Sequence, residues 1–235
     1  MSTQSKSTRP PRASVSSLPP VAASAPRKRK RLRKEEIVQE ATRLFAERGY
    51  EGTSMGDLAE RVGLRKASLF HHFPSKDVLY ATVLAQLVDS VKSAILDAAK
   101  SEGSFAERLD ALTDALTTTL GAHSHAARLL IREAMDWGPV MKDRLGKTIE
   151  GVLAAALEFA KAGQREGVFH PDIDPVHAIV SLIGIHFMPF TIGDIVERFA
   201  GSSPFDAAFL EERKIAVRDQ VRLLVLAKPP KPTKR

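Results

Sequence analysis

Residues 53–76, TSMGDLAERVGLRKASLFHHFPSK, constrain the fold more than any other stretch of the chain. Two short runs with helical spacing of apolar residues lie on either side of Gly63. Pro74 ends the second run, because the residue before a proline is driven out of helical geometry. Two short helices joined by a glycine turn have the proportions of a helix-turn-helix, so we predict this motif over residues 54–73.

The helical pattern continues on both sides of this motif. From Glu35 onward, apolar residues recur every three or four positions until Gly49 stops the run. Thr53 and Ser54 are good N-caps for the helix that follows them, and Ser75 is a good N-cap for a long later helix. We therefore predict a helix, a short helix, a glycine turn, a second short helix and a long helix.

The adjacent histidines His71 and His72 suggest either a metal site or a surface that meets a polyanion. Adjacent helical residues point about 100° apart, and the i, i+4 spacing of helical zinc ligands is absent. The chain also contains no cysteine, which excludes thiolate ligands and disulfides. We expect no metal site here, and packing at the helix end stays an alternative role for His72.

A helix that starts near Lys66 has two different faces. Leu69 and Phe73 are four residues apart and can point into a core. The opposite side carries Lys66, Ala67, Phe70 and His71. Lysine, and the neighbouring Ser68, can donate to phosphates or bases, while alanine allows close approach to a thymine methyl group. These residue types fit a helix that enters the DNA major groove.

Positive charge is concentrated at the two ends of the chain. Residues 1–34 hold ten Lys/Arg and no acid, although the whole chain carries a net charge of only +7. We expect a disordered basic tail over residues 1–30, because its Ser, Pro, Ala and Thr cannot build a core, and a second basic tail over 228–235. The cluster RKRKRLRK at 27–34 is either an arm that contacts DNA phosphates or a solvated charge run.

The rest of the chain, residues 92–227, continues as helices without the alternation typical of strands. The penultimate helix, within 175–199, is apolar nearly all round and has to be buried on most sides. A second copy could cover it, so we expect a homodimer in which the last two helices of each chain form a four-helix bundle. The uncharged stretch 178–193 is short for a membrane span, and we expect no membrane segment.

An apolar ligand cavity is expected within the C-terminal helices. Pro189 removes a helical hydrogen bond, and a kink there would open space for a ligand. The candidate lining residues are Trp137, Phe159, His186, Phe187 and Phe190. Packing in the core or at a dimer interface accounts for the same residues equally well.

The stretch FAERGYEGTSMGDLAERVGLRKASLFHHFPSKDVL closely resembles the DNA-binding domain of the TetR (tetracycline-repressor) family of bacterial transcriptional regulators. The resemblance implies an all-α fold with a DNA-binding domain over 31–91, joined by a long helix to a ligand-binding and dimerisation domain over 92–227. By the same resemblance, the residues at or near DNA are Thr53, Ser54, Arg65, Lys66, Ala67, Ser68, Phe70, His71, His72 and Lys76.

The chain departs from the family pattern within the second helix of the motif. Arg65 stands where the family often has a small N-capping residue, and Phe70 and His71 stand where it often has tyrosine. The loss of two phenolic hydroxyls removes the usual tyrosine–phosphate bonds. Arg65 can supply a replacement charge, so we expect rearranged contacts to the DNA backbone.

Taken with these features, the resemblance implies a cytoplasmic, nucleoid-associated bacterial regulator. It further implies a homodimer that binds a palindromic operator in double-stranded DNA, acts as a repressor, and is released by a small-molecule effector that is apolar in part. An architectural DNA-binding protein that needs no ligand is the alternative. We expect no enzyme and no cofactor, because the sequence holds no Ser-His-Asp pattern, phosphate loop or helical zinc motif.

Overall fold

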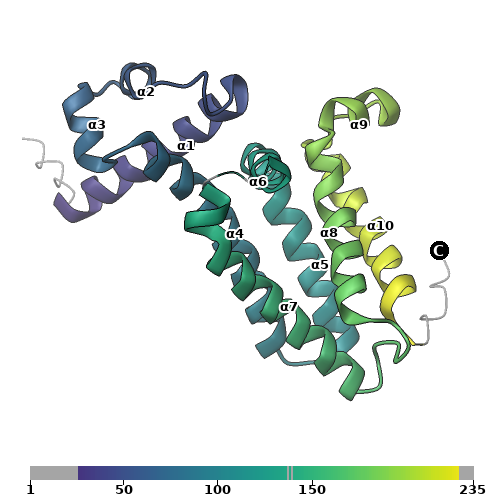
Figure 1. Cartoon of the computed structure of the whole chain (residues 1–235). Coiled ribbons are helices and arrows are strands. Elements are labelled where there is room, and N and C mark those ends of the chain that lie inside the picture. The colour runs from purple at the N-terminus through teal and green to yellow at the C-terminus, as the bar shows by residue number, and fades with distance from the viewer. Residues whose placement is uncertain (1–25, 137, 139, 228–235) are drawn as a thin grey trace, which may run out of the picture.

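The computed structural model describes residues 26–136, 138 and 140–227, and over that range it consists of helices joined by short turns (Figure 1). An N-terminal head contains α1 (Pro26–Arg48), α2 (Met55–Arg61) and α3 (Lys66–His72), and α4 (Lys76–Lys100) leads from it into the C-terminal domain. That domain adds α5 (Phe105–Ala122), α6 (Ser124–Asp136), a π-helical turn (Met141–Leu145), α7 (Gly146–Arg165), α8 (Pro175–Thr191), α9 (Gly193–Ala200) and α10 (Ala207–Val225). The predicted all-α class is confirmed, since the only β pairing among these residues is one isolated bridge.

Serine side chains fix where the helices around the turn begin. The Ser54 hydroxyl accepts a hydrogen bond from the Asp57 amide at 3.1 Å, at the start of α2. The Ser75 hydroxyl accepts one from the Val78 amide at 3.2 Å, at the start of α4. Each bond satisfies an amide that a first helical turn leaves without a backbone partner. The N-caps predicted at Ser54 and Ser75 are confirmed.

The core of the head takes side chains from all three of its helices and from α4. Leu69 and Phe73 are buried, so the inward face predicted from their spacing is confirmed. They pack in one cluster with Phe45 of α1 and Leu58 of α2. The same cluster continues along α4 to Leu129 of α6. The head and the C-terminal domain therefore share a continuous core, and the predicted boundary near residue 91 lies inside α4.

The helix α4 is long and apolar enough in composition to cross a membrane, as is the α8–α9 pair if it is taken as one span. In the folded chain α4 packs against α1, α5, α6 and α7. Its apolar residues, among them Leu84, Leu87 and Ile95, are buried in the two clusters that make up the protein core. Core burial therefore accounts for the composition of α4.

The arrangement of the C-terminal domain leaves α8 and α10 side by side along one edge (Figure 1). The helix α8 contacts α5, α6 and α7 on its inner side, and α10 packs on α5 and α8. An ion pair between Arg222 and Asp110 joins α10 to α5.

The basic segment differs from its prediction. The helix α1 begins at Pro26, earlier than the predicted start at Glu35, so the tail predicted over 1–30 is helical from Pro26 onward. Proline suits the first position of a helix, and Lys and Arg are good helix formers, which explains the early start. The remaining parts of the two predicted tails, residues 1–25 and 228–235, lie outside the described residues.

The predicted penultimate helix is also divided. The helix α8 continues past Pro189 to Thr191, and the chain then turns by 79° into α9. Gly193, the first residue of α9, is buried, and a Cβ atom there would lie 3.1 Å from the Phe205 ring. Glycine thus permits this tight crossing, and the turn comes after the expected kink site at Pro189.

Candidate functional site

The outward face of α3 carries the residues that the sequence placed at a DNA interface. Lys66, Ala67, Ser68, Phe70 and His71 are exposed, and Phe70 keeps 39% of its surface open to solvent. This uncovered apolar area contributes nothing to the stability of the free protein. Such a face is available to a partner.

The turn before α3 is fixed by backbone geometry and by α1. Gly63 has φ +62°, in the left-handed region that favours glycine. The Leu64 amide donates to the Ala59 carbonyl at 2.8 Å. From α1, the Arg33 Nη2 atom donates to the Val62 carbonyl at 2.7 Å. These contacts hold the two helices of the motif at a fixed angle, as groove recognition requires.

Charge pairing separates the cations of the head into two groups. Arg61 is held by Glu40 at 2.6 Å and by Glu47 at 2.9 Å, so its charge is neutralised locally. Arg65 and Lys66, at the start of α3, are exposed and form no ion pair within the described residues. They remain free to meet phosphate oxygens, which charged donors bind strongly.

Four of the residues predicted at DNA make other contacts or are partly covered in the structure. Thr53 is buried, and its hydroxyl donates to the Gly49 carbonyl at 2.8 Å, so its side chain faces the interior of the head. The Lys76 ammonium donates to the Tyr50 carbonyl at 3.0 Å and lies over the Tyr50 ring at 4.1 Å, which ties it to the head. His72 is half-buried, while Ser54 is exposed and its hydroxyl caps α2.

The adjacent histidines point in different directions. The ring centroids of His71 and His72 lie 6.0 Å apart, and their planes are inclined by 72°. Among the described residues no group of three His, Asp or Glu side chains could hold a metal ion. Exposed His71 is therefore placed as a hydrogen-bond donor for a polyanion, and half-buried His72 is placed at the edge of the core.

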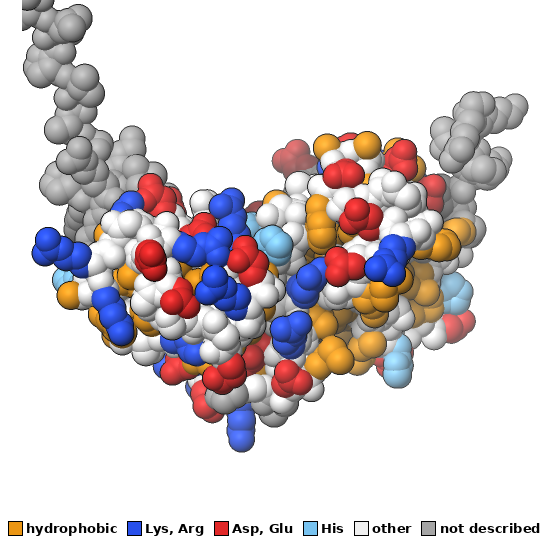
Figure 2. All heavy atoms as spheres, turned by 90° about the horizontal axis from the view of Figure 1, so that it is seen from above, with side chains coloured by type: hydrophobic (Ala, Val, Ile, Leu, Met, Phe, Trp, Pro, Cys, Tyr) orange, Lys and Arg blue, Asp and Glu red, His pale blue; other side chains and the backbone are white. Residues whose placement is uncertain are grey.

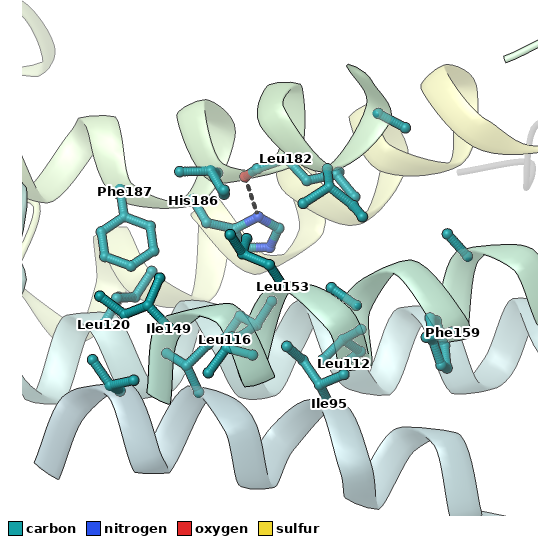
Figure 3. Close-up of a pocket in the computed structure, with 18 of the residues that line it drawn as sticks. Ile95, Leu112, Leu116, Leu120, Ile149, Leu153, Phe159, Leu182, His186 and Phe187 are labelled. Carbon is teal, nitrogen blue, oxygen red and sulfur yellow. Dashed lines mark hydrogen bonds between the residues drawn. The ribbon is translucent and has the colours of Figure 1, made fainter. Parts of the chain in front are cut away.

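A cavity of about 300 Å³ lies inside the C-terminal domain, between α4, α5, α6, α7 and α8. This volume is at the small end of the range for ligand pockets. Of the residues that line it, every one except His186 is apolar. Figure 3 shows His186 pointing from α8 toward the aliphatic side chains of α5 and α7. The cavity is built to hold a largely apolar molecule.

Within the described part of the chain, one nitrogen of the His186 ring is hydrogen-bonded, and the other is not. Its Nδ1 lies 2.9 Å from the Leu182 carbonyl, and a carbonyl only accepts, so Nδ1 carries the hydrogen. Its buried Nε2 has no hydrogen-bond partner among the described residues. Burial lowers the pKa of His186, and Arg213 adds to this effect, while the carbonyls of Leu182 and Thr113 oppose it. The neutral ring thus presents an unpaired acceptor, Nε2, in an apolar surrounding.

The structure places the predicted pocket residues in three groups. Phe159, His186 and Phe187 line the cavity. Phe190 is buried in the core outside it and stacks on Phe205 at 6.1 Å, because α8 turns its ring toward the end of the domain. Trp137 lies outside the described residues.

Sequence reasoning missed the aliphatic majority of the cavity wall. Leucines from one stripe of α5 and residues of α7 supply it: Leu109, Leu112, Leu116, Leu120, Ile149, Val152 and Leu153. In the sequence, Leu109, Leu112, Leu116 and Leu120 recur at helical spacing. Whether such a stripe meets packed side chains or a void is decided by tertiary packing.

A second apolar surface lies on the outside of the C-terminal domain. It is formed by exposed residues of α8, α9 and α10 that do not line the cavity: Val176, Val180, Met188, Ile192, Ile195, Phe199, Ile215 and Leu223. We call this set the outer apolar surface. Phe199 is 92% exposed and Leu223 is 71% exposed. Figure 2, seen from above, shows apolar side chains over the C-terminal half and many charged side chains over the head.

Comparisons with known proteins agree with this arrangement. Residues 37–83 match the family described as bacterial regulatory proteins of the tetR family, and residues 106–221 match a tetracyclin repressor-like C-terminal domain. The HTH-type transcriptional regulator RutR of Escherichia coli K12 is 28% identical over 185 residues, which span 77% of this chain and 84% of RutR.

Two solved structures share the fold. The ketosteroid transcriptional regulator KstR2 of Mycobacterium tuberculosis aligns with a TM-score of 0.69 and 21% identity, over 83% of this chain and 96% of that one. AibR, solved in complex with isovaleryl coenzyme A and operator DNA, aligns with a TM-score of 0.64 and 20% identity, over 80% of this chain and 97% of that one. With both of its domains matched and its head and C-terminal helices arranged in the same way, the chain belongs to the TetR family of bacterial transcriptional regulators.

Proposed function

We propose that the protein is a repressor that binds a palindromic operator as a homodimer and leaves it when a small-molecule effector fills the C-terminal cavity. One observation carries the proposal: the exposed face of α3 and the apolar cavity are joined by a single helix. The helix α4 packs on α1 in the head and lines the cavity with Val88, Val91 and Ile95.

On DNA, α3 would lie in the major groove with its outward face against the bases. Lys66 and Ser68 would donate to base edges or phosphates, and Ala67 would allow close approach. Arg65 and His71 would contact the phosphate backbone, where the family pattern has a small residue and a tyrosine. Ser54 and Lys76 would lie at the margin of this interface. Thr53 is left out, because its side chain is buried.

The homodimer would form through the outer apolar surface. An apolar area of this kind on a single chain is typical of an interface with a partner, and α8 and α10 lie together along one edge of the domain. The same patch from two chains would make a twofold contact. Two heads related by that axis would read two half-sites of a palindrome.

The dimer is tested by placing charges in the outer apolar surface. Val180→Glu in α8 and Leu223→Glu in α10 should each convert the dimer to a monomer in sedimentation velocity, because paired carboxylates would face each other across the axis. Met135→Glu in α6 is the matched control, since Met135 is 81% exposed but lies outside this surface. Variants of α8 and α10 that stay dimeric would contradict the proposed interface.

Effector release would act through α4. A ligand between α4, α5, α7 and α8 would change how these helices pack, and α4 would transmit the change to the separation of the two heads. A coupling of about 1–3 kcal/mol is typical of such linked sites. The AibR complex with isovaleryl coenzyme A and operator DNA supports the general arrangement of one ligand site and one DNA site in this fold.

The alternative is an architectural protein that binds any duplex through its basic segment. Selection of random duplexes on the purified full-length protein, followed by sequencing, separates the two functions. Enrichment of one palindrome would support the repressor. Uniform recovery of all sequences, with an affinity that depends on salt alone, would contradict it and favour the architectural protein.

A further inference from the structure

The effector cavity contains one unpaired hydrogen-bonding atom. His186 Nε2 is buried and without a partner, and the residues around it are apolar. A buried acceptor that has lost its water costs free energy until a donor reaches it. The backbone carbonyl of Thr113 also acts on the ring, but it is an acceptor and already takes a hydrogen bond from the Thr117 hydroxyl at 2.9 Å. Among the described residues, Nε2 therefore has no donor.

The tautomer of the ring decides which ligand group Nε2 can take. Because Nδ1 donates to Leu182, Nε2 of the neutral ring is an acceptor. A ligand therefore has to bring a hydroxyl or an N–H group to this position. A ligand carbonyl or ether oxygen, which only accepts, would leave both atoms unsatisfied.

The charge of the wall limits the ligand further. Among the residues that the structure describes, none of those lining the cavity is Lys, Arg, Asp or Glu. Arg213, whose charge helps to lower the pKa of His186, donates from Nη2 to the Ile185 carbonyl at 2.8 Å and does not line the cavity. A carboxylate or an ammonium group would lose its water here without gaining a charged partner.

The volume of the cavity limits the number of atoms in the ligand. A water molecule occupies about 30 Å³ in the liquid, so 300 Å³ holds roughly ten atoms other than hydrogen. Leu153 of α7 and Ile183 of α8 line the cavity and are also 41% and 38% exposed. The cavity therefore reaches the surface between α7 and α8, where a slender molecule can enter.

We propose that the effector is an uncharged amphiphile of about ten non-hydrogen atoms, with one hydroxyl or N–H donor bound to His186 Nε2 and an apolar body held by α5 and α7. This inference rests on the proposed effector cavity and names the chemical class that fills it. His186 sets the specificity of the site, and the leucines supply most of the binding free energy.

Two isomers of equal size test the proposal: the primary alcohol nonanol, which has a donor, and methyl octyl ether, which has none. Isothermal titration calorimetry on the full chain without DNA should show nonanol binding about tenfold tighter than the ether, the value of one hydrogen bond that pairs a buried acceptor. Nonanoate should bind more weakly than nonanol. Equal affinities for the two isomers, or tightest binding of nonanoate, would overturn the proposal.

Two variants show whether His186 is the cause. In His186→Leu the preference for the alcohol should disappear, with the ether bound at least as well as in the original chain. In His186→Gln, whose amide oxygen can stand near the position of Nε2, the preference should persist. A preference that survives in His186→Leu would overturn the assignment. The wild-type comparison of the isomers needs no variant, so the test holds even if one of them fails to fold.

The same probes distinguish this inference from the proposed function. Nonanol is added to the complex of the protein with its selected operator. Preferential binding of nonanol without release of DNA would support the role of His186 and contradict effector release. Release of DNA by the ether as readily as by the alcohol would overturn the role of His186 and leave the repressor intact. Binding of neither isomer would overturn the inference alone.

Discussion

The Arg213 Nη2 atom of α10 donates a hydrogen bond to the Ile185 carbonyl of α8 at 2.8 Å. Ile185 lies four residues before Pro189, whose ring nitrogen has no hydrogen to give to that carbonyl. Arg213 therefore replaces the helical bond that Pro189 removes. This replacement explains how α8 continues past Pro189 to Thr191, and it fastens α10 to α8 at the edge where we place the dimer.

Removal of Arg213 should cost more stability when Pro189 is present than when it is replaced. We expect Arg213→Met to lower the free energy of unfolding by about 1–3 kcal/mol, because the Ile185 carbonyl is left unpaired. With Pro189→Ala in the background, the alanine amide can bond to that carbonyl, and the cost should fall to less than half. Urea unfolding at one fixed protein concentration measures both values. An equal cost in the two backgrounds would contradict this coupling.

Single substitutions on α3 should weaken DNA binding without changing assembly. We expect Lys66→Ala to reduce operator affinity by about 1–3 kcal/mol if the side chain reads a base, and His71→Ala to have a smaller effect through a phosphate. Fluorescence anisotropy gives the affinities, and sedimentation gives the assembly state. Lys142→Ala, an exposed lysine in the π-helical turn, is the control and should bind normally. Loss of the dimer in either α3 variant would refute the division between head and interface.

The basic start of α1 should contribute to affinity on every duplex. Replacement of Arg27, Lys28, Arg29, Lys30 and Arg31 by Gln keeps the chain length and spares Arg33, which supports the turn through Val62. The slope of log affinity against log salt should become less steep by about 0.9 for each phosphate contact that is lost. Replacing the four cations of KPPKPTKR by Gln gives a comparison variant at the other end. An unchanged slope in the α1 variant would show that this cluster does not contact DNA phosphates and is only a solvated run of charges.

The lowered pKa of His186 predicts a loss of stability in acid. Burial is its main cause, so the unfolded chain, whose histidine pKa is about 6.5, binds the proton more readily than the folded chain. The stability that neutral His186 contributes is complete above that pH. It is lost as the pH falls through the lower pKa that His186 has in the folded chain. Between pH 7 and pH 5 the wild type should lose more stability than His186→Gln, by at most about 1.4 kcal/mol per pH unit. Identical pH profiles in urea unfolding would contradict a buried neutral ring.

Local signals in the sequence were enough to predict the head. Ser54, Gly63 and Ser75 act on neighbouring residues, so their caps and turn follow from residue type and spacing. The inward face of α3 follows from the spacing of Leu69 and Phe73. Thr53 has the chemistry of a cap, but Ser54 caps α2 and the Thr53 hydroxyl bonds the Gly49 carbonyl just after α1.

The C-terminal domain depended on packing between distant segments, which spacing alone does not reveal. Phe190 has the residue type of a pocket wall, but α8 turns it toward Phe205. The turn at Ile192 needs buried Gly193 next to Phe205 and Pro204, and no local signal marks that crossing. His186 was identified as a candidate, but that its Nε2 lacks a partner among the described residues follows only from the positions of Leu182 and the cavity wall.

The central claim is that α3 reads a DNA sequence, and the most direct test compares two duplexes of equal length. One is the palindrome obtained by selection, and the other has the same base composition in scrambled order. At near-physiological salt we predict that the full-length protein binds the palindrome at least about a thousandfold more tightly, as sequence-specific regulators do. Equal affinities for the two duplexes at every salt concentration would contradict the account, because only charge would then attract the protein to DNA.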